Sequence, residues 1–146
     1  MTIKAVAPGK AVLIGEYSVL AGGPAVVLAT SSFASISLES TGSESWAFET
    51  LGFQSEPELV NADRLPASSG SSLISAILKK FGLATLRDLS KEGLPPSRII
   101  TDSSSFFLSG KKLGLGSSAA VCTASYRLLC LSLIHISEPT RPLYIS

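Results

Sequence analysis

Lys112-Leu113-Gly114-Leu115-Gly116-Ser117-Ser118-Ala119-Ala120 is a glycine-rich turn that leads into a helical pattern. Glycine lets the backbone approach a ligand closely, and the first turn of a helix offers unpaired N–H groups at the positive end of its dipole. Such a turn is suited to binding phosphates. The hydroxyls of Ser117 and Ser118 add hydrogen-bond donors, and one of them could bind Mg²⁺. The small side chains of Ala119 and Ala120 leave room for a nucleotide.

Several interpretations of this turn compete. It is not a P-loop, because no Gly-x-x-x-x-Gly-Lys-Ser/Thr pattern is present. It matches the relaxed dinucleotide fingerprint Gly-x-Gly-x-x-Ala. That fingerprint needs an acidic residue about 20 residues further on, and Glu138 is the one candidate. A helix capped by serine, with glycines that serve packing alone, fits the turn as well.

The rest of the chain consists of strand patterns with two helix patterns. We predict that Pro8-Gly9 splits two strands, and that the continuous apolar run at residues 25–29 is a buried strand. Residues 52–67 are predicted to be a loop, and Ser71-Ser72 to cap a helix that ends at Gly82. The predicted strands are 3–7, 11–14, 25–29, 33–38, 46–48, 98–101 and 105–108, and the predicted helices are 72–81 and 117–129. Runs of strands with a few helices, without strict alternation, predict an α+β fold.

Composition and charge narrow the class of protein. The 146 residues are 45% hydrophobic and 16% charged, which supports one domain with a real core. A net charge of +1 gives no electrostatic case for a nucleic acid or an acidic membrane surface as a partner. No signal peptide and no run of about 20 apolar residues is present. We therefore expect a cytoplasmic protein that does not bind a membrane.

The two cysteines are predicted to be free thiols. If Cys122 and Cys130 lie on one helix, they are about 12 Å apart along its axis. A disulfide needs Cα atoms within about 7 Å of each other. Free thiols indicate a reducing compartment, and no cluster of cysteine and histidine indicates a metal site.

A second motif, near the amino terminus, helps to choose among the interpretations of the glycine-rich turn. Its sequence is Ala7-Pro8-Gly9-Lys10-Ala11-Val12-Leu13-Ile14-Gly15-Glu16-Tyr17-Ser18-Val19-Leu20-Ala21-Gly22. It closely resembles the first motif of the GHMP kinases, in which Pro-Gly-Lys precedes two or three apolar residues, a Gly-Glu pair and a later glycine. Residues 112–120 resemble the second motif of the same family. The resemblance covers residues 3 to about 130.

The resemblance implies a fold and a set of site residues. The expected fold is the α+β amino-terminal lobe of a GHMP kinase, similar to ribosomal protein S5 domain 2, with a left-handed βαβ crossover. Lys10 would neutralise the transferring phosphoryl group or activate the acceptor hydroxyl, Glu16 would orient Lys10 or the substrate, and Ser118 would bind Mg²⁺. The expected ATP-binding residues are Lys112, Gly114, Leu115, Gly116, Ser117, Ser118, Ala119 and Ala120. The competing interpretations are solvated Lys10 and Glu16 and a serine that only caps the helix.

The resemblance implies phosphoryl transfer from ATP to a small metabolite, and leaves a homodimer open. Lys112, with the segment 102–107 before it, is more similar to phosphomevalonate kinases, which convert phosphomevalonate to diphosphomevalonate. Mevalonate kinases tend to have Pro and Gly-Ala before the turn. A mevalonate kinase, a non-catalytic nucleotide-binding module and a Rossmann oxidoreductase remain alternatives. The oxidoreductase would need a parallel sheet, which the strand pattern does not support.

Residues 131–146 differ in character from the rest of the chain. The segment 131–141 resembles a conceptual translation of a sequencing-library adaptor, so we expect a boundary near Cys130 between the lobe (1–130) and a non-native tail (131–146). A genuine divergent tail is the alternative. The tail holds the single histidine, His135, to which we assign no catalytic role. On the adaptor interpretation, the catalytic aspartate of the family and its carboxy-terminal lobe are missing. The 146-residue chain would then be inactive and would fold poorly.

Overall fold

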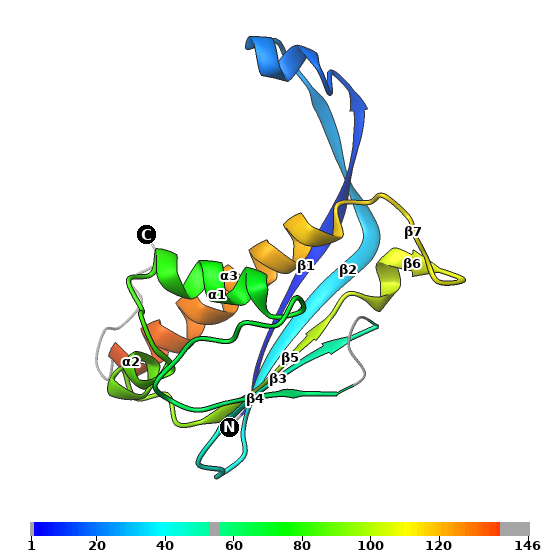
Figure 1. Ribbon diagram of the computed structural model, residues 1–146. Helices are drawn as coiled ribbons and strands as arrows, with labels where there is room; N and C mark the ends of the chain where they lie inside the picture. The colour runs from blue at the N-terminus through cyan, green and yellow to red at the C-terminus, as the bar shows by residue number, and fades with distance from the viewer. Residues whose placement is uncertain (1, 53–55, 138–146) are drawn as a thin grey trace.

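The computed structural model describes residues 2–52 and 56–137, the last four of them by their backbone alone (Figure 1). The strands are β1 (Thr2–Ile14), β2 (Val26–Ser40), β3 (Trp46–Leu51), β4 (Glu58–Val60), β5 (Ser97–Asp102), β6 (Phe107–Leu108) and β7 (Lys111–Lys112). The α-helices are α1 (Ser72–Lys80), α2 (Leu86–Lys91) and α3 (Ser117–Ser137). Two short 3₁₀ helices, η1 (Ser18–Ala21) and η2 (Ser104–Phe106), complete the set. The predicted α+β class is confirmed.

Five strands form one mixed sheet in the order β1-β2-β5-β3-β4. The pairs β1–β2, β2–β5 and β3–β4 are antiparallel, whereas β3 and β5 run parallel. Helix α3 packs along β1 and β2, and α1 packs against α3, so the helices cover one face of the sheet (Figure 1). A separate antiparallel hairpin, β6–β7, turns at Ser109-Gly110 just before the glycine-rich turn.

Two apolar clusters hold these elements together. The larger one lies between the sheet and the helices, and its fully buried side chains include Leu38, Trp46, Phe48, Leu78 and Leu128. The burial pattern of β3 alternates residue by residue, which is the expected behaviour of a strand with one face on a core. The smaller cluster, of Ala34, Phe106 and Ala120, lies under the start of α3.

Three sequence predictions are corrected in the first half of the chain. Pro8-Gly9 does not split a strand: β1 is continuous, with a register shift between Pro8 and Lys10. Proline is tolerated there because β1 is an edge strand, where a missing N–H costs no ladder bond. Residues 25–29 are not buried, since Val26, Val27 and Leu28 are each about half exposed. The predicted loop at 52–67 contains the short strand β4.

The second half of the chain agrees more closely with its predictions. Helix α1 lies where its apolar spacing predicts it, and Gly82 follows it in the left-handed conformation. Ser71 occupies the N-cap position but makes no capping hydrogen bond. Helix α2 had no prediction, and only the end of the predicted strand at 105–108 is a strand, because η2 takes its first half.

Helix α3 runs through the proposed boundary at Cys130 and continues to Ser137. Ser132 is fully buried and donates a hydrogen bond to the Leu128 carbonyl, at 2.7 Å. A continuous helix is compatible with either origin of the tail, so the boundary stays a prediction. Residues 138–146, including Glu138, lie outside the described residues.

Both cysteines lie on α3 and are free thiols, as predicted. Among the helices of the described segments, none combines the length and the hydropathy that crossing a membrane requires.

Candidate functional site

The glycine-rich turn connects β7 to α3 and depends on its two glycines. Gly114 and Gly116 have φ angles of 73° and 72°, in the left-handed region that other residues adopt only at a cost. A Cβ on Gly116 would also lie 2.8 Å from Cγ of Lys10, whereas a Cβ on Gly114 would meet no atom within 4 Å. Position 116 therefore requires glycine because of both its φ angle and the lack of room for a Cβ, whereas position 114 favours glycine because of its φ angle alone.

The two sequence motifs meet at this turn. The Lys10 N–H donates a hydrogen bond to the Leu115 carbonyl, with an N···O distance of 2.8 Å. The neighbouring Gly9 is buried, and a Cβ there would lie 2.5 Å from the same carbonyl oxygen and 2.4 Å from Cε1 of Phe106. Glycine at position 9 thus lets the turn dock directly on β1. Leu115 packs against the small apolar cluster that contains Phe106, and this contact anchors the turn to the core.

On one side of the turn is a pocket of about 350 Å³, the Lys10 pocket, lined by Lys10, Ala11, Val12, Glu16, Gly114 and Gly116. Lys10 and Glu16 are both exposed there, and within the described residues no ion pair joins them. Glu16 is positioned by the tip of the β1–β2 hairpin, where the Ser18 hydroxyl donates to the Pro24 carbonyl at 2.9 Å. The structure therefore brings together a cation and an anion from one motif and two glycines from the other.

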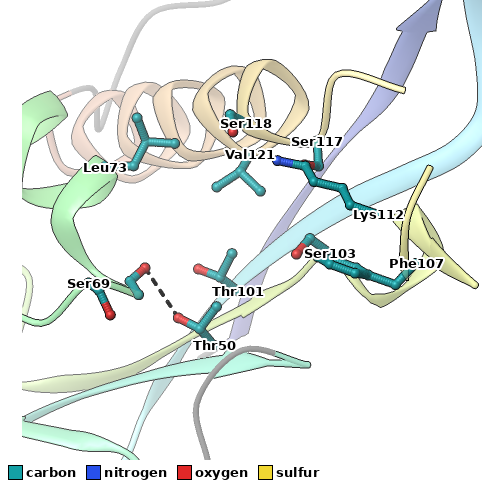
Figure 2. Close-up of a pocket in the computed structure, with 11 residues that line it drawn as sticks. Thr50, Ser69, Leu73, Thr101, Ser103, Phe107, Lys112, Ser117, Ser118 and Val121 are labelled. Atoms are coloured by element: carbon teal, nitrogen blue, oxygen red, sulfur yellow. Dashed lines mark hydrogen bonds between the residues drawn. The ribbon is translucent and has the colours of Figure 1, made fainter. Parts of the chain in front are cut away.

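On the other side is a second pocket of about 150 Å³, the threonine pocket (Figure 2). It is lined by Thr50, Ser69, Gly70, Leu73, Thr101, Ser103, Phe107, Lys112, Ser117, Ser118 and Val121. Leu73, Phe107 and Val121 give it apolar walls, and hydroxyl groups surround them. Figure 2 shows the Lys112 side chain extending toward the start of α3. No acidic residue of the described segments lines this pocket, so no carboxylate in the lining would repel a phosphate group there.

The start of α3 borders the threonine pocket with two different serines. Ser117 is buried and Ser118 is exposed, so the second hydroxyl is free to reach a ligand or a cation. Ala119 is exposed, whereas Ala120 is buried and its N–H donates to the Gly116 carbonyl at 3.0 Å. The N–H groups of the first helical turn before Ala120 have no helical acceptor and point toward the turn. Free N–H groups at a helix start suit the binding of an anion.

Sequence patterns had given no sign of most of the threonine pocket. Thr50 and Thr101 are partners in the parallel β3–β5 pair, and Leu73 comes from α1. The pairing of two strands distant in the chain cannot be read from either strand alone. Asp102, at the end of β5, accepts hydrogen bonds from the N–H and hydroxyl of Ser104, at 3.0 and 2.7 Å.

Several solved structures share this fold. The Streptococcus pneumoniae phosphomevalonate kinase, in complex with phosphomevalonate and AMPPNP, is 23% identical with a TM-score of 0.62, over 94% of this chain and 38% of its own. The Methanococcus jannaschii mevalonate kinase is 18% identical with a TM-score of 0.60, over 88% of this chain and 39% of its own. A D-glycero-D-manno-heptose 1-phosphate kinase from Bacteroides thetaiotaomicron is 18% identical with a TM-score of 0.62, over 95% of this chain and 43% of its own.

These likenesses establish the fold of the chain, and they confirm the resemblance to the GHMP kinases at that level. The chain spans about two fifths of the length of each of these kinases. No protein-family model matches the sequence, and no curated protein matches it. The roles of the individual residues therefore rest on the geometry described above.

Proposed function

We propose that this chain forms the nucleotide-binding part of a kinase that transfers a phosphoryl group from ATP to a small molecule. The observation that carries the proposal is the single segment 114–118, which borders both pockets. Its glycines line the Lys10 pocket and its serines line the threonine pocket. A phosphate chain lying along this segment would have its nucleoside on one side and its transferable end on the other.

The threonine pocket suits the nucleoside end of ATP. Flat apolar bases bind against aromatic and aliphatic side chains, with a few polar groups to orient them. Phe107, Leu73 and Val121 provide such walls, and Thr50 and Thr101 provide hydroxyls. Lys112 would attract the phosphates where they leave the pocket, and the free N–H groups of the first turn of α3 would bind them.

The residues at the start of α3 also fit Mg²⁺. This ion keeps several waters and is usually held by one or two protein oxygens together with substrate phosphates. The exposed hydroxyl of Ser118 borders the threonine pocket, so it would hold the ion beside the phosphates. Bound there, the ion would supply charge neutralisation for the phosphate oxygens.

In the transfer step the acceptor oxygen forms a bond to the γ-phosphorus as the bond from that phosphorus to the ADP oxygen breaks. Catalysis of this kind depends on positioning and charge neutralisation. Lys10, whose side chain lies beside Gly116, would neutralise the moving phosphoryl group. Glu16 would orient the acceptor from the far side of the same pocket.

We propose phosphomevalonate as the acceptor, with diphosphomevalonate as the product. Lys112 directly before the turn supports this choice, as does the fold shared with a phosphomevalonate kinase. Mevalonate is the second candidate, because a mevalonate kinase shares the fold nearly as closely. A non-catalytic nucleotide-binding module is the alternative from another class.

Two measurements test the proposal. Calorimetric titration of this chain should show ATP binding that Mg²⁺ strengthens. A coupled assay of ADP release, on the product of the complete gene, should show turnover with phosphomevalonate and little with mevalonate. Turnover with mevalonate and none with phosphomevalonate would make mevalonate the acceptor. ATP binding without turnover of either acceptor would favour the non-catalytic module.

Lys10→Ala is the decisive variant, with Lys4→Ala as its control because Lys4 lies on the same strand, exposed and remote from both pockets. We expect Lys10→Ala to lower kcat about 100-fold or more while ATP affinity changes little, and Lys4→Ala to change neither. Equal activity of the two variants would contradict the role of Lys10.

A further inference from the structure

A carboxylate outside both pockets holds one wall of the threonine pocket. Glu58, on the short strand β4, faces the segment 67–71 that precedes α1. Its Oε1 accepts a hydrogen bond from the Ala67 N–H at 2.9 Å, and its Oε2 accepts bonds from the Ser68 N–H at 3.2 Å and the Ser71 hydroxyl at 2.6 Å. One side chain thus ties three points of a five-residue segment, which we call the serine loop.

The serine loop is further tied within itself and to the sheet. The hydroxyls of Ser68 and Ser71 lie 2.9 Å apart, and the Thr50 hydroxyl donates to the Gly70 carbonyl at 3.3 Å. Ser71 is 1% exposed and Glu58 is half-buried, so the Ser71 end of their hydrogen bond is out of contact with water. Two members of the loop, Ser69 and Gly70, line the threonine pocket beside Thr50 (Figure 2). The loop is therefore a pocket wall whose position depends on groups outside the pocket.

We propose that Glu58 is a positioning residue for the nucleotide: by fixing the serine loop, it sets the affinity of the threonine pocket for the nucleoside end of ATP. This inference rests on the proposed function. It predicts that Glu58 affects the binding of a nucleoside triphosphate and leaves binding of the phosphate chain alone unaffected. The hydrogen bonds of Glu58 within the described residues go to the serine loop, not to the turn at 114–118.

The chain offers a matched control in Asp88. This carboxylate also ties a loop to the start of a helix, since its Oδ2 accepts bonds from the N–H groups of Ala84 and Thr85 and from the Thr85 hydroxyl, at 3.0–3.1 Å. None of these residues lines either pocket. Glu58→Gln and Asp88→Asn therefore both neutralise a carboxylate that ties a loop, one beside the pocket and one away from it. Asp88→Asn also removes the ion pair between Asp88 and Lys91.

The experiment measures the Kd of MgATP and of inorganic tripolyphosphate for the wild-type chain, Glu58→Gln and Asp88→Asn, together with the Tm of each. We expect Glu58→Gln to weaken MgATP about 10-fold, equivalent to about 1.4 kcal/mol, and tripolyphosphate less than about twofold. We expect Asp88→Asn to lower Tm without changing either Kd. Ser71→Ala, which removes the shortest bond and keeps the carboxylate, should weaken MgATP about threefold and serves if Glu58→Gln does not fold.

The outcomes separate the inference from the function on which it rests. If the wild type binds MgATP and both Glu58→Gln and Ser71→Ala bind it equally well, Glu58 has a structural role only and the inference is wrong. Equal weakening of MgATP and tripolyphosphate would also overturn it, because the effect would then not be confined to the nucleoside end. A wild type that binds neither ligand would overturn the proposed function, and this inference with it.

Discussion

The two halves of the β1–β2 hairpin are both paired antiparallel, but their surroundings differ. In the body of the molecule, Ala5 and Ala7 on β1 and Ile36 and Leu38 on β2 are at most 3% exposed. Beyond Lys10 the same strands continue as an arm, residues 11–28, that projects away from the other elements (Figure 1). There Leu13 is 62% exposed and Ile14 67%.

The comparison separates what pairing supplies from what packing supplies. Antiparallel pairing runs through both halves, with Ala11 opposite Leu28 in the arm and Ala5 opposite Ile36 in the body. A second register shift, between Val12 and Ile14, lies within the arm. Only the body half has α3 across its face. A two-stranded hairpin alone is marginally stable in water, so the arm depends on the body for its stability. Lys10 stands at the junction, and Glu16 lies on the arm.

The largest difference between the halves should appear with leucine truncations on β2. Leu38 is 2% exposed and part of the main core. Leu38→Ala should lower the free energy of unfolding by about 2–5 kcal/mol, because it removes buried surface and leaves a cavity. Urea denaturation followed by tryptophan fluorescence measures this, since Trp46 lies in the same core. A loss below about 1 kcal/mol would show that the body is not packed as described.

The junction should be the next most sensitive place. Gly116→Ala imposes a left-handed φ on alanine and places its Cβ against the Lys10 side chain, which should cost about 2 kcal/mol and weaken MgATP. Gly114→Ala shares the φ and meets no neighbouring atom, so it should cost about 1 kcal/mol. Denaturant titration of both variants compares them. Equal losses would mean that contact with Lys10 does not matter at the junction.

Low pH should lower the free energy of unfolding by protonating Glu58. Partial burial alone would raise the pKa of Glu58, but hydrogen bonds from Ala67, Ser71 and Ser68 outweigh it and lower the pKa to about 2 from its ordinary 4.5. A lowered folded-state pKa stabilises the protein above the ordinary value, and that stabilisation is lost as the pH falls from 4.5 toward 2. The free energy of unfolding, measured by urea denaturation at several pH values in this range, should fall less steeply with falling pH for Glu58→Gln than for the wild type. Parallel curves would refute the assignment.

The smallest effect belongs to the arm. Leu28 lies on the same strand as Leu38 and is 48% exposed, so Leu28→Ala should change the free energy of unfolding by less than about 1 kcal/mol. The same denaturation experiment measures it. A loss that matches that of Leu38→Ala would show that the arm is buried in solution, for example against a second copy of the chain.

The sequence predicted features that depend on neighbours in the chain and missed those that depend on partners in space. Helix α1 follows from the spacing of Ile74, Ile77 and Leu78, and the turn at 114–118 follows from its glycines. The run at Val26–Leu28 predicted burial, but an apolar run shows only that a strand can be covered, and within the described residues no element packs over it. The three-residue β4 is too short for a periodic signal.

The site divides in the same way. Lys10, Glu16, Gly114 and Gly116 were all named from two local motifs, and the structure gathers them in one pocket. Thr101 had no local signal, because its place in a pocket follows from the pairing of β3 with β5. Glu58 also had no local signal, because its hydrogen-bond partner Ser71 is thirteen residues away in the chain.

The sheet order also has a consequence for how the chain is made on the ribosome. β5 lies between β2 and β3, yet it is the last strand of the sheet to be synthesised. Until residues 97–102 have emerged, β2 has one paired edge and β3 has no link to the hairpin. The nascent chain must therefore carry the core residues Ile36 and Leu38 of β2 without a completed sheet beside them. Chaperones that bind exposed apolar strands would meet this protein at that stage of its synthesis.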